Sequence, residues 1–163
     1  MASEILQKGP TVISPERFVE QLTAELGLVP GAELSETNMK KIAKKYPQLF
    51  PVALFKSLGR WNLVLNVPQG RMEIYDPLIG LRTIPGQFPA GSLLYFDAIK
   101  GNGLVTTTDI QRVRESGYYL SSRISQALKS LGEIQKNPTD TNSWMFSIYA
   151  GMVARGTIIP TAK

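Results

Sequence analysis

Residues 61–75, WNLVLNVPQGRMEIY, place apolar and polar side chains in alternation on either side of a short turn. Successive side chains of a strand point to opposite faces of the sheet. One face of the first half therefore carries Trp61, Leu63, Leu65 and Val67. Pro68-Gln69-Gly70 supplies a turn before residues 71–75, so the segment predicts a β-hairpin.

Further strands are expected on both sides of this hairpin. Residues 51–55 and residues 92–99 form short apolar runs of strand length. The stretch from 77 to 91 is rich in Gly and Pro, which favour turns, and we expect it to be a loop.

Helix signals precede and follow this central region. Ser14-Pro15 is a helix start, since Ser accepts a free N–H and Pro suits the first helical position; this helix should end near Gly27. A second helix should begin at Ser35 and end before Pro47. Two shorter helices are expected after Asp109 and from Ser121 or Ser122 to Leu131.

Residues 144–154, WMFSIYAGMVA, are apolar on nearly every face, which is typical of a helix buried on all sides. Asn142 or Ser143 should cap it, and Arg155-Gly156 should end it. The predicted fold class is α+β: a central, mostly antiparallel sheet packed on a buried C-terminal helix, flanked by N-terminal and additional helices.

The chain of 163 residues, 43% apolar and 19% charged, predicts one globular domain. We expect residues 1–13 and 157–163 to be loosely ordered tails. The absence of Cys and His excludes disulfides, a thiolate nucleophile, an imidazole base and the usual zinc ligands, and no cofactor is expected. Neither a membrane span nor a signal peptide is expected, so an intracellular location is predicted, in the cytoplasm or nucleus.

Eighteen Lys and Arg against 13 Asp and Glu give a net charge of +5, a value that a solvated surface can explain by itself. The basic residues expected to share one face are Lys40, Lys41, Lys44, Lys45, Arg112, Arg114 and Arg123. Nucleic acid is the alternative partner that this face would suit.

Residues 49–78, LFPVALFKSLGRWNLVLNVPQGRMEIYDPL, resemble the catalytic hairpin of the cysteine-protease superfamily that contains the SUMO proteases and the adenovirus protease. Arg60-Trp61 stands where that family has His-Trp, and Asp76 stands at its acidic position. The separation, 76 − 60 = 16, is close to that of the family.

Residues 142–146, NSWMF, resemble the family's Asp-Cys-Gly-x-Phe, in which the nucleophilic Cys opens a buried central helix. Ser143 takes the Cys position and Trp144 the Gly position. Asn137 or, with a gap, Gln135 stands where the family places the Gln of its oxyanion hole. The resemblance implies a papain-like or adenovirus-protease-like fold and a binding groove around Trp61, Trp144 and Gln135.

Arg60 cannot act as a base, because its guanidinium stays protonated, and the Ser143 hydroxyl has no base beside it. The resemblance therefore implies an inactive relative, a pseudoprotease that binds another protein, either a ubiquitin-like modifier or an assembly partner. An ion pair between Arg60 and Asp76 is expected to replace the family's His–Asp contact.

Purely structural roles for these residues, and two other functions, stay open beside the pseudoprotease hypothesis. Ser143 is favoured as a helix cap, Asp76 as a turn former before Pro77, and Trp61 as a core aromatic. A basic nucleic-acid-associated protein, viral or encoded by a mobile element, is the alternative function. A Ser/Lys hydrolase is a third hypothesis, which the polar surroundings of the lysines disfavour.

Overall fold

The computed structural model describes residues 11–29, 32–68, 70–99, 103–118, 122–137 and 141–161. The described helices are α1 (Pro15–Glu25), α2 (Glu36–Lys45), the 3-10 turn η2 (Pro47–Leu49), α3 (Ile110–Glu115), α4 (Ser122–Leu131) and α5 (Ser143–Ala154). The described strands are β1 (Thr11–Ile13), β2 (Val52–Ser57), β3 (Arg60–Asn66), β4 (Arg71–Asp76), β5 (Gly80–Pro85), β6 (Leu93–Ile99), β7 (Gly103–Thr107) and β8 (Ile158–Pro160).

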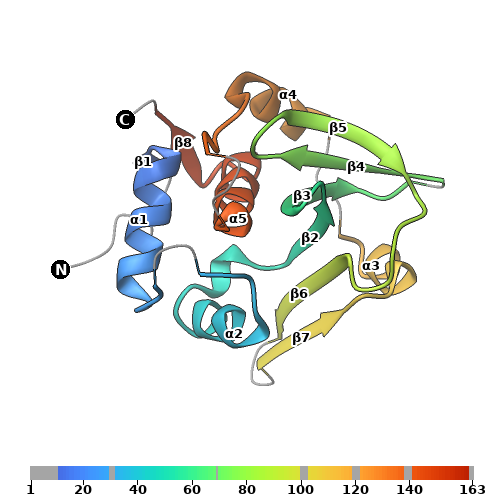
Figure 1. Ribbon diagram of the computed structural model, residues 1–163, viewed down its shortest axis with the longest axis horizontal. Coiled ribbons are helices and arrows are strands. Elements are labelled where there is room, and N and C mark those ends of the chain that lie inside the picture. Colours follow the sequence, from blue (N-terminus) through green and yellow to red (C-terminus); the bar gives the residue numbers. More distant parts are fainter. Residues whose placement is uncertain are drawn as a thin grey trace.

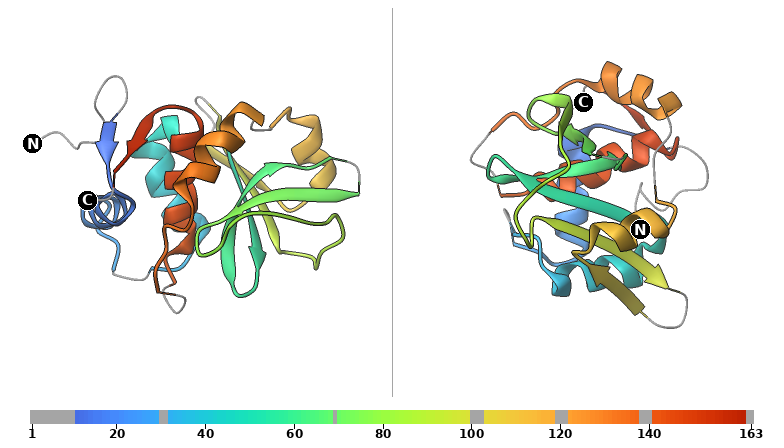
Figure 2. Two further views of the ribbon diagram at one scale, coloured as in Figure 1. Left: turned by 90° about the horizontal axis from the view of Figure 1, so that it is seen from above. Right: turned by 90° about the vertical axis from the view of Figure 1, so that its right-hand side faces the viewer.

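The fold is mixed α+β, with an open antiparallel sheet of six strands in the order β5-β4-β3-β2-β6-β7 (Figure 1). The predicted hairpin is confirmed: β3 and β4 pair antiparallel, with Leu63 opposite Tyr75. β2 lies between β3 and β6 and pairs antiparallel with both. Figure 2 shows α5 between this sheet and α1. The pair of strands β1 and β8 lies beside α1.

Local signals place the helix starts correctly. The Ser14 hydroxyl accepts a hydrogen bond from the Arg17 amide at 3.2 Å, and Ser35 accepts one from Asn38 at 3.1 Å. Asp109 caps α3 in the same way. At the end of α5, Arg155 is the C-cap and Gly156 follows with a φ of +78°, the left-handed conformation that glycine adopts without strain.

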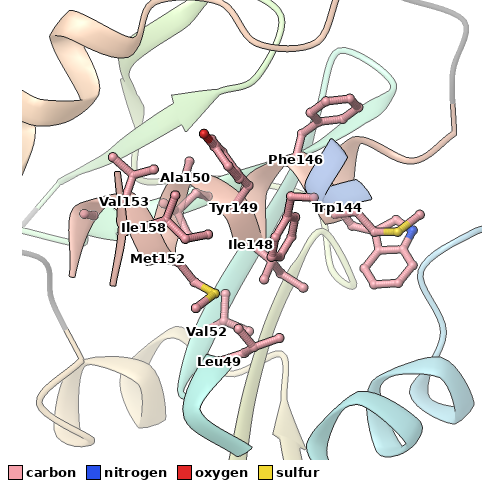
Figure 3. Packing of buried hydrophobic residues seen from close by; sticks show 14 of the residues in the cluster. Leu49, Val52, Trp144, Phe146, Ile148, Tyr149, Ala150, Met152, Val153 and Ile158 are labelled. Atoms are coloured by element: carbon pink, nitrogen blue, oxygen red, sulfur yellow. The ribbon is translucent and has the colours of Figure 1, made fainter. Parts of the chain in front are cut away.

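The hydrophobic core has two parts, one on each face of the sheet. Alternate residues of β2 divide between them: Val52 and Leu54 join the part that contains α5, whereas Ala53 and Phe55 face the other. All twelve residues of α5 are buried, as its apolar composition predicts, and they form the centre of the larger part (Figure 3). Its contacts include β3, α1, α4 and β8.

The structure differs from the sequence expectations in three irregular regions, in two of them only for the residues that are described. The stretch 77–91 contains strand β5, in which Leu81, Thr83 and Pro85 are exposed while Arg82 is partly buried, so the apolar and polar residues do not alternate in the way that a strand's sequence signal requires. The tails expected at 1–13 and 157–163 contain β1 and β8, which pair in parallel from Thr11 opposite Ile158 to Ile13 opposite Pro160. A pairing between segments so far apart leaves no local sequence signal. Residues 1–10 and 162–163 lie outside the described residues.

Candidate functional site

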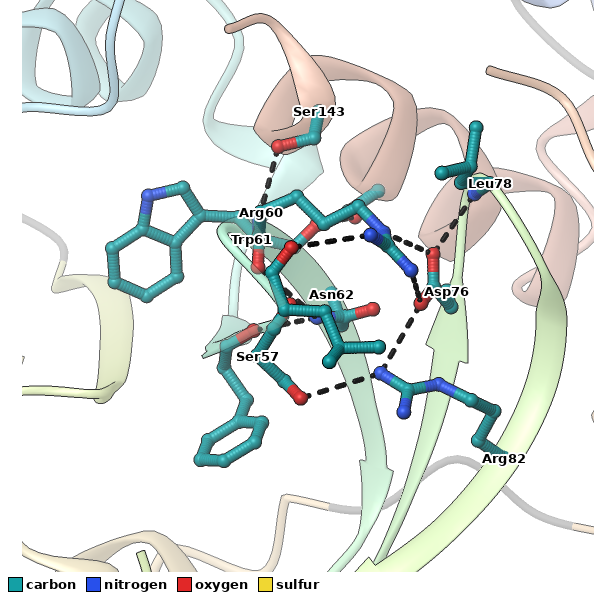
Figure 4. A network of polar contacts seen from close by, with 11 residues as sticks. Ser57, Arg60, Trp61, Asn62, Asp76, Leu78, Arg82 and Ser143 are labelled. Carbon is teal, nitrogen blue, oxygen red and sulfur yellow. Dashed lines mark hydrogen bonds and ion pairs between the residues drawn. The ribbon is translucent and has the colours of Figure 1, made fainter. Parts of the chain in front are cut away.

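Asp76, at the end of β4, is fully buried and is the centre of a polar cluster (Figure 4). Arg60, the first residue of β3, donates from Nε to Asp76 Oδ1 at 2.8 Å and from Nη2 to Oδ2 at 2.6 Å. This two-pronged geometry is the strongest form of an arginine–carboxylate pair. The predicted ion pair between the two residues is therefore confirmed.

Two further donors complete the surroundings of Asp76. Arg82, from β5, places Nη2 3.1 Å from Asp76 Oδ2. The Leu78 amide donates to Oδ1 at 2.9 Å, so Asp76 also forms the turn before Pro77 that the sequence indicates. Burial by itself would raise the pKa of Asp76, but hydrogen bonds from Arg60 and Leu78 and the charges of both arginines hold that pKa below its ordinary value. Asp76 is thus held as a carboxylate.

The backbone of Trp61 is held by the first turn of α5. The Ser143 hydroxyl accepts a hydrogen bond from the Trp61 amide at 2.9 Å, and the Ser147 hydroxyl donates to the Trp61 carbonyl at 3.0 Å. Both serines are buried and lie four residues apart, on the same side of the helix. α5 is therefore joined to β3 by two polar contacts besides its apolar packing.

The register of the hairpin explains why a helix supplies these contacts. Leu63 lies opposite Tyr75, so continuing the pairing by two residues would put Pro77 opposite Trp61. Proline carries no N–H and cannot donate to the Trp61 carbonyl. Ser147 donates instead, and the Pro77 carbonyl accepts from the amides of Ile134 and Gln135, each at 2.8 Å.

Arg60 and Trp61 point to opposite faces of the sheet, as adjacent strand residues must. Figure 4 shows the guanidinium of Arg60 directed at Asp76 and the indole of Trp61 directed away from the pair. The Arg60 guanidinium is engaged by Asp76 and by the Leu58 carbonyl, whereas the Ser143 hydroxyl meets the backbone amide of Trp61. Arg60 and Asp76 thus contact each other, whereas Ser143 contacts the backbone of the residue after Arg60 and neither of the two side chains.

The expectation that Ser143 caps α5 is wrong. Asn142 occupies the cap position and makes no side-chain cap hydrogen bond. The Ser143 hydroxyl is directed at β3 and not at the helix's own amides, because it supplies the acceptor that the Trp61 amide lacks in the sheet.

Two of the three groove residues expected from the resemblance lie inside the protein, which corrects that expectation. Trp144 is fully buried, and its indole N–H donates to the Ala32 carbonyl at 2.7 Å. Gln135 is also buried, and its Nε2 donates to the carbonyl of exposed Asn137 at 3.0 Å. Trp61 is half-buried, with Lys56 Nζ 5.8 Å from the centre of its ring, so its side chain is the one of the three that a partner can reach.

The basic residues expected on one face are divided by the sheet. The buried residues of α2 pack in the part of the core that contains α5, and Val113 of α3 packs in the part on the opposite face. The four lysines of α2 are exposed. Arg114 is occupied by the Val67 carbonyl, to which it donates at 3.1 Å. The side chain of Arg123 lies outside the described residues.

Sequence reasoning missed two members of the cluster, Arg82 and Ser147. Arg82 lies in β5, which was expected to be a loop, and the sequence of β5 carries no alternation of apolar and polar residues that could have placed it. Ser147 stands four residues after Ser143 in a helix of otherwise apolar residues, and that spacing is the signal for a shared partner.

Exposed apolar side chains lie in the two turns beside the ion pair. Leu58, in the β2–β3 turn, is 65% exposed, and Ile79, in the β4–β5 turn, is 55% exposed. Leu58 has a φ of +57° and Gly59 a φ of +77°, the conformation of a two-residue hairpin turn that favours Asn-Gly. A leucine in this conformation is strained. We call residues 58–59 and 77–79 the paired turns.

A scan against protein-family models, a search of curated proteins and a search of solved structures each find no match for this chain. Among the described residues, no helix is both long and apolar enough to cross a membrane. The same residues hold no group of three or more carboxylates that could bind a metal ion.

Proposed function

We propose that this chain is a non-catalytic protein-binding module on a cysteine-protease-like fold of the SUMO-protease and adenovirus-protease type. The observation that carries the proposal is the bidentate pair between Arg60 and Asp76, the positions at which the resembled family has His and Asp. Ser143, at the position of the family's Cys, opens the buried helix and bonds to the residue after Arg60.

The chemistry of these residues supports binding over hydrolysis. Arg60 holds its proton at every physiological pH and donates both prongs of its guanidinium to Asp76. The Ser143 oxygen accepts from a backbone amide, and no imidazole or thiol exists anywhere in the chain. With buried Trp144 in the Gly position, the space that would hold a substrate's tail is occupied by the core.

The paired turns are the proposed binding surface. Arg60 connects them, since it bonds to the Leu58 carbonyl and to Asp76, which in turn accepts from Leu78. The ion pair therefore fixes the position of exposed Leu58 relative to Ile79, and the strain at Leu58 is of the kind that persists at functional sites. The proposed partner is a folded protein of the ubiquitin-like class, which the resemblance suggests.

An NMR titration tests the proposal. The ¹⁵N-labelled chain is titrated with unlabelled ubiquitin and, separately, with a SUMO-type modifier. We expect saturable shifts at Leu58, Trp61 and Ile79 with one of the two proteins. Leu58→Asn should weaken that binding at least fivefold while leaving the fold intact, because asparagine tolerates a positive φ but removes the apolar side chain.

Val29→Asn is the matched control, since Val29 is 71% exposed and lies outside the paired turns. It should leave the affinity within twofold of the unsubstituted chain. Equal weakening by both variants would contradict the assignment of the paired turns. Absence of saturable shifts with both modifiers would overturn the ubiquitin-like partner.

A further inference from the structure

No strand in the described part of the chain lies beside the outer edge of β7. β7 ends the sheet and pairs on its inner side with β6, from Gly103 opposite Ile99 to Thr107 opposite Tyr95. Among the described residues, the backbone of β7 makes no hydrogen bond to any element other than β6. The outward N–H and C=O groups of an edge strand are a template for another strand.

The opposite edge of the sheet, β5, is protected and β7 is not. β5 contains Pro85 and the charged Arg82, and α4 packs against it. Charge, proline and a covering helix are the usual means of blocking an edge. β7 reads GLVTT, with no charge, no proline and no bulge in its pairing with β6.

A basic helix flanks this edge on one face of the sheet, and a cavity lined by charges of both signs flanks it on the other. α2 packs against β7 on one face and presents four exposed lysines, of which Lys41 and Lys44 have no acidic partner among the described residues. On the other face, α3 and β7 line a cavity of about 270 Å³ that includes Val105, Thr107 and Arg112. The face of β7 that α2 covers is therefore basic, whereas on the other face Arg112 is accompanied by Asp97 and Glu115.

We propose that the edge of β7 binds an extended acidic segment of a partner protein, which adds to the sheet as a seventh strand. Main-chain hydrogen bonds would supply affinity, and alternate side chains would supply specificity. β7 itself is uncharged, so the flanking lysines decide the sign of the ligand. Side chains on the α2 face would be acidic.

The chemistry of the cavity suggests what the other face would take. Its lining combines the carboxylates of Asp97 and Glu115 with Arg112 and the hydroxyls of Tyr95 and Ser116. A hydroxyl side chain, which both donates and accepts, suits such a mixed lining. The pattern expected of the ligand is therefore acidic residues alternating with serine or threonine.

Pairing with a second copy of the chain is disfavoured by the same charges. A twofold axis through two β7 edges would place both α2 helices on one face of the joined sheet, because the axis is perpendicular to the sheet. Their exposed lysines would then repel one another. The edge of β7 is a different surface from the paired turns, and its proposed role does not depend on the protease resemblance.

The test uses a fluorescein-labelled peptide of seven residues in which glutamate and threonine alternate. We expect saturable anisotropy at physiological salt and NMR shifts centred on residues 103–107. Two further peptides carry N-methyl groups on all glutamates or on all threonines. Because successive amides of a strand point to opposite edges, one methylated peptide should lose at least tenfold in affinity and the other should retain most of it.

Charge variants of the protein supply the second arm. Lys41→Glu with Lys44→Glu should weaken binding at least tenfold. Lys129→Glu with Lys136→Glu changes the net charge equally at exposed sites outside α2 and should leave the affinity within twofold. The unlabelled peptide should displace the probe, and a single-stranded oligonucleotide should not.

Several results would overturn the proposal. Equal binding of both methylated peptides would show simple charge attraction, and displacement by the oligonucleotide would identify a polyanion surface. A dimer in sedimentation that the peptide does not dissociate would assign the edge to a second copy. Loss of the response to ubiquitin-like proteins would leave this result intact, since Leu58 lies in the β2–β3 turn and not on β7.

Discussion

The cluster around Asp76 and the outer edge of β7 belong to one sheet, but they differ in how charge and hydrogen bonding are arranged. At Asp76 a buried carboxylate receives hydrogen bonds or ion pairs from two arginines and one backbone amide. At β7 the outer backbone groups make no hydrogen bond to any described residue, and the lysines nearby lie on the exposed face of α2.

This difference separates structural charge from charge that is available for binding. A buried ion pair in which both carboxylate oxygens are engaged fixes the position of one strand relative to another, and removal of one member leaves a buried charge. Exposed lysines beside an open strand are hydrated and free to meet a ligand. The Arg60–Asp76 cluster thus underlies the proposed binding surface at the paired turns, and the edge of β7 underlies the proposed strand-binding site.

The largest expected effect is the loss of the central carboxylate. Asp76→Asn leaves Arg60 and Arg82 facing a neutral amide inside the protein, and we expect it to lower the free energy of unfolding by about 3–5 kcal/mol. Urea denaturation measures the change. Asp97→Asn, in β6 beside the cavity, is the matched control and should cost less than about 1 kcal/mol, because Asp97 is only half-buried. Equal losses in the free energy of unfolding would show that Asp76 is no more important for stability than Asp97.

Removal of the serine contacts should have the next largest effect. Ser143→Ala leaves the partly buried Trp61 amide without its acceptor and should cost about 1–3 kcal/mol, reduced slightly by the better helix propensity of alanine. Thermal denaturation measures it. Ser57→Ala removes only a 3.4 Å contact with Arg82 and serves as the control. A Ser143 variant as stable as the control would show that α5 is held by apolar packing alone.

Leu58→Asn should stabilise the protein. Asparagine tolerates the positive φ that strains leucine, so we expect a gain of about 1 kcal/mol in the free energy of unfolding. Chemical denaturation of the variant beside Gly59→Ala provides the comparison, since alanine at 59 introduces strain and should destabilise the same turn. Loss of stability in Leu58→Asn would show that the leucine packs against the fold and is not presented for binding.

The smallest expected effect is the acid dependence of the cluster. The pKa of Asp76 is lower in the folded protein than its ordinary value near 4, so its contribution is complete above that pH. The contribution is lost as the pH falls through the lowered folded-state pKa. The stability difference between the unsubstituted chain and Asp76→Asn should therefore shrink below pH 4. Denaturation midpoints between pH 2 and 7 measure it, and a difference that stays constant would contradict the lowered pKa.

Much of the fold could be predicted because its signals are local. The caps at Ser14, Ser35 and Asp109, the β3–β4 hairpin and the apolar α5 each depend on residues close in sequence. β1 and β8 could not be predicted, since each consists of three residues whose pairing partner lies almost a whole chain away.

Only those members of the site could be predicted whose separation along the hairpin indicates that they lie close together. The register that separates Arg60 from Asp76 by 16 residues led to the ion pair between them. The third member, Arg82, depends on a strand that polar residues conceal. The role of Ser143 depends on Pro77, which breaks the ladder at Trp61, and that relation is visible only once the register of β3 and β4 is known.

A double-mutant cycle between Arg60 and Asp76 tests the central claim most directly. The free energy of unfolding is measured for the unsubstituted chain, Arg60→Met, Asp76→Asn and the double variant. We predict a coupling energy of about 2 kcal/mol or more, because the two side chains share a bidentate contact in the protein interior. Losses that add to within about 0.5 kcal/mol would contradict the account, since Arg60 and Asp76 would then act as independent residues and not as a structural pair.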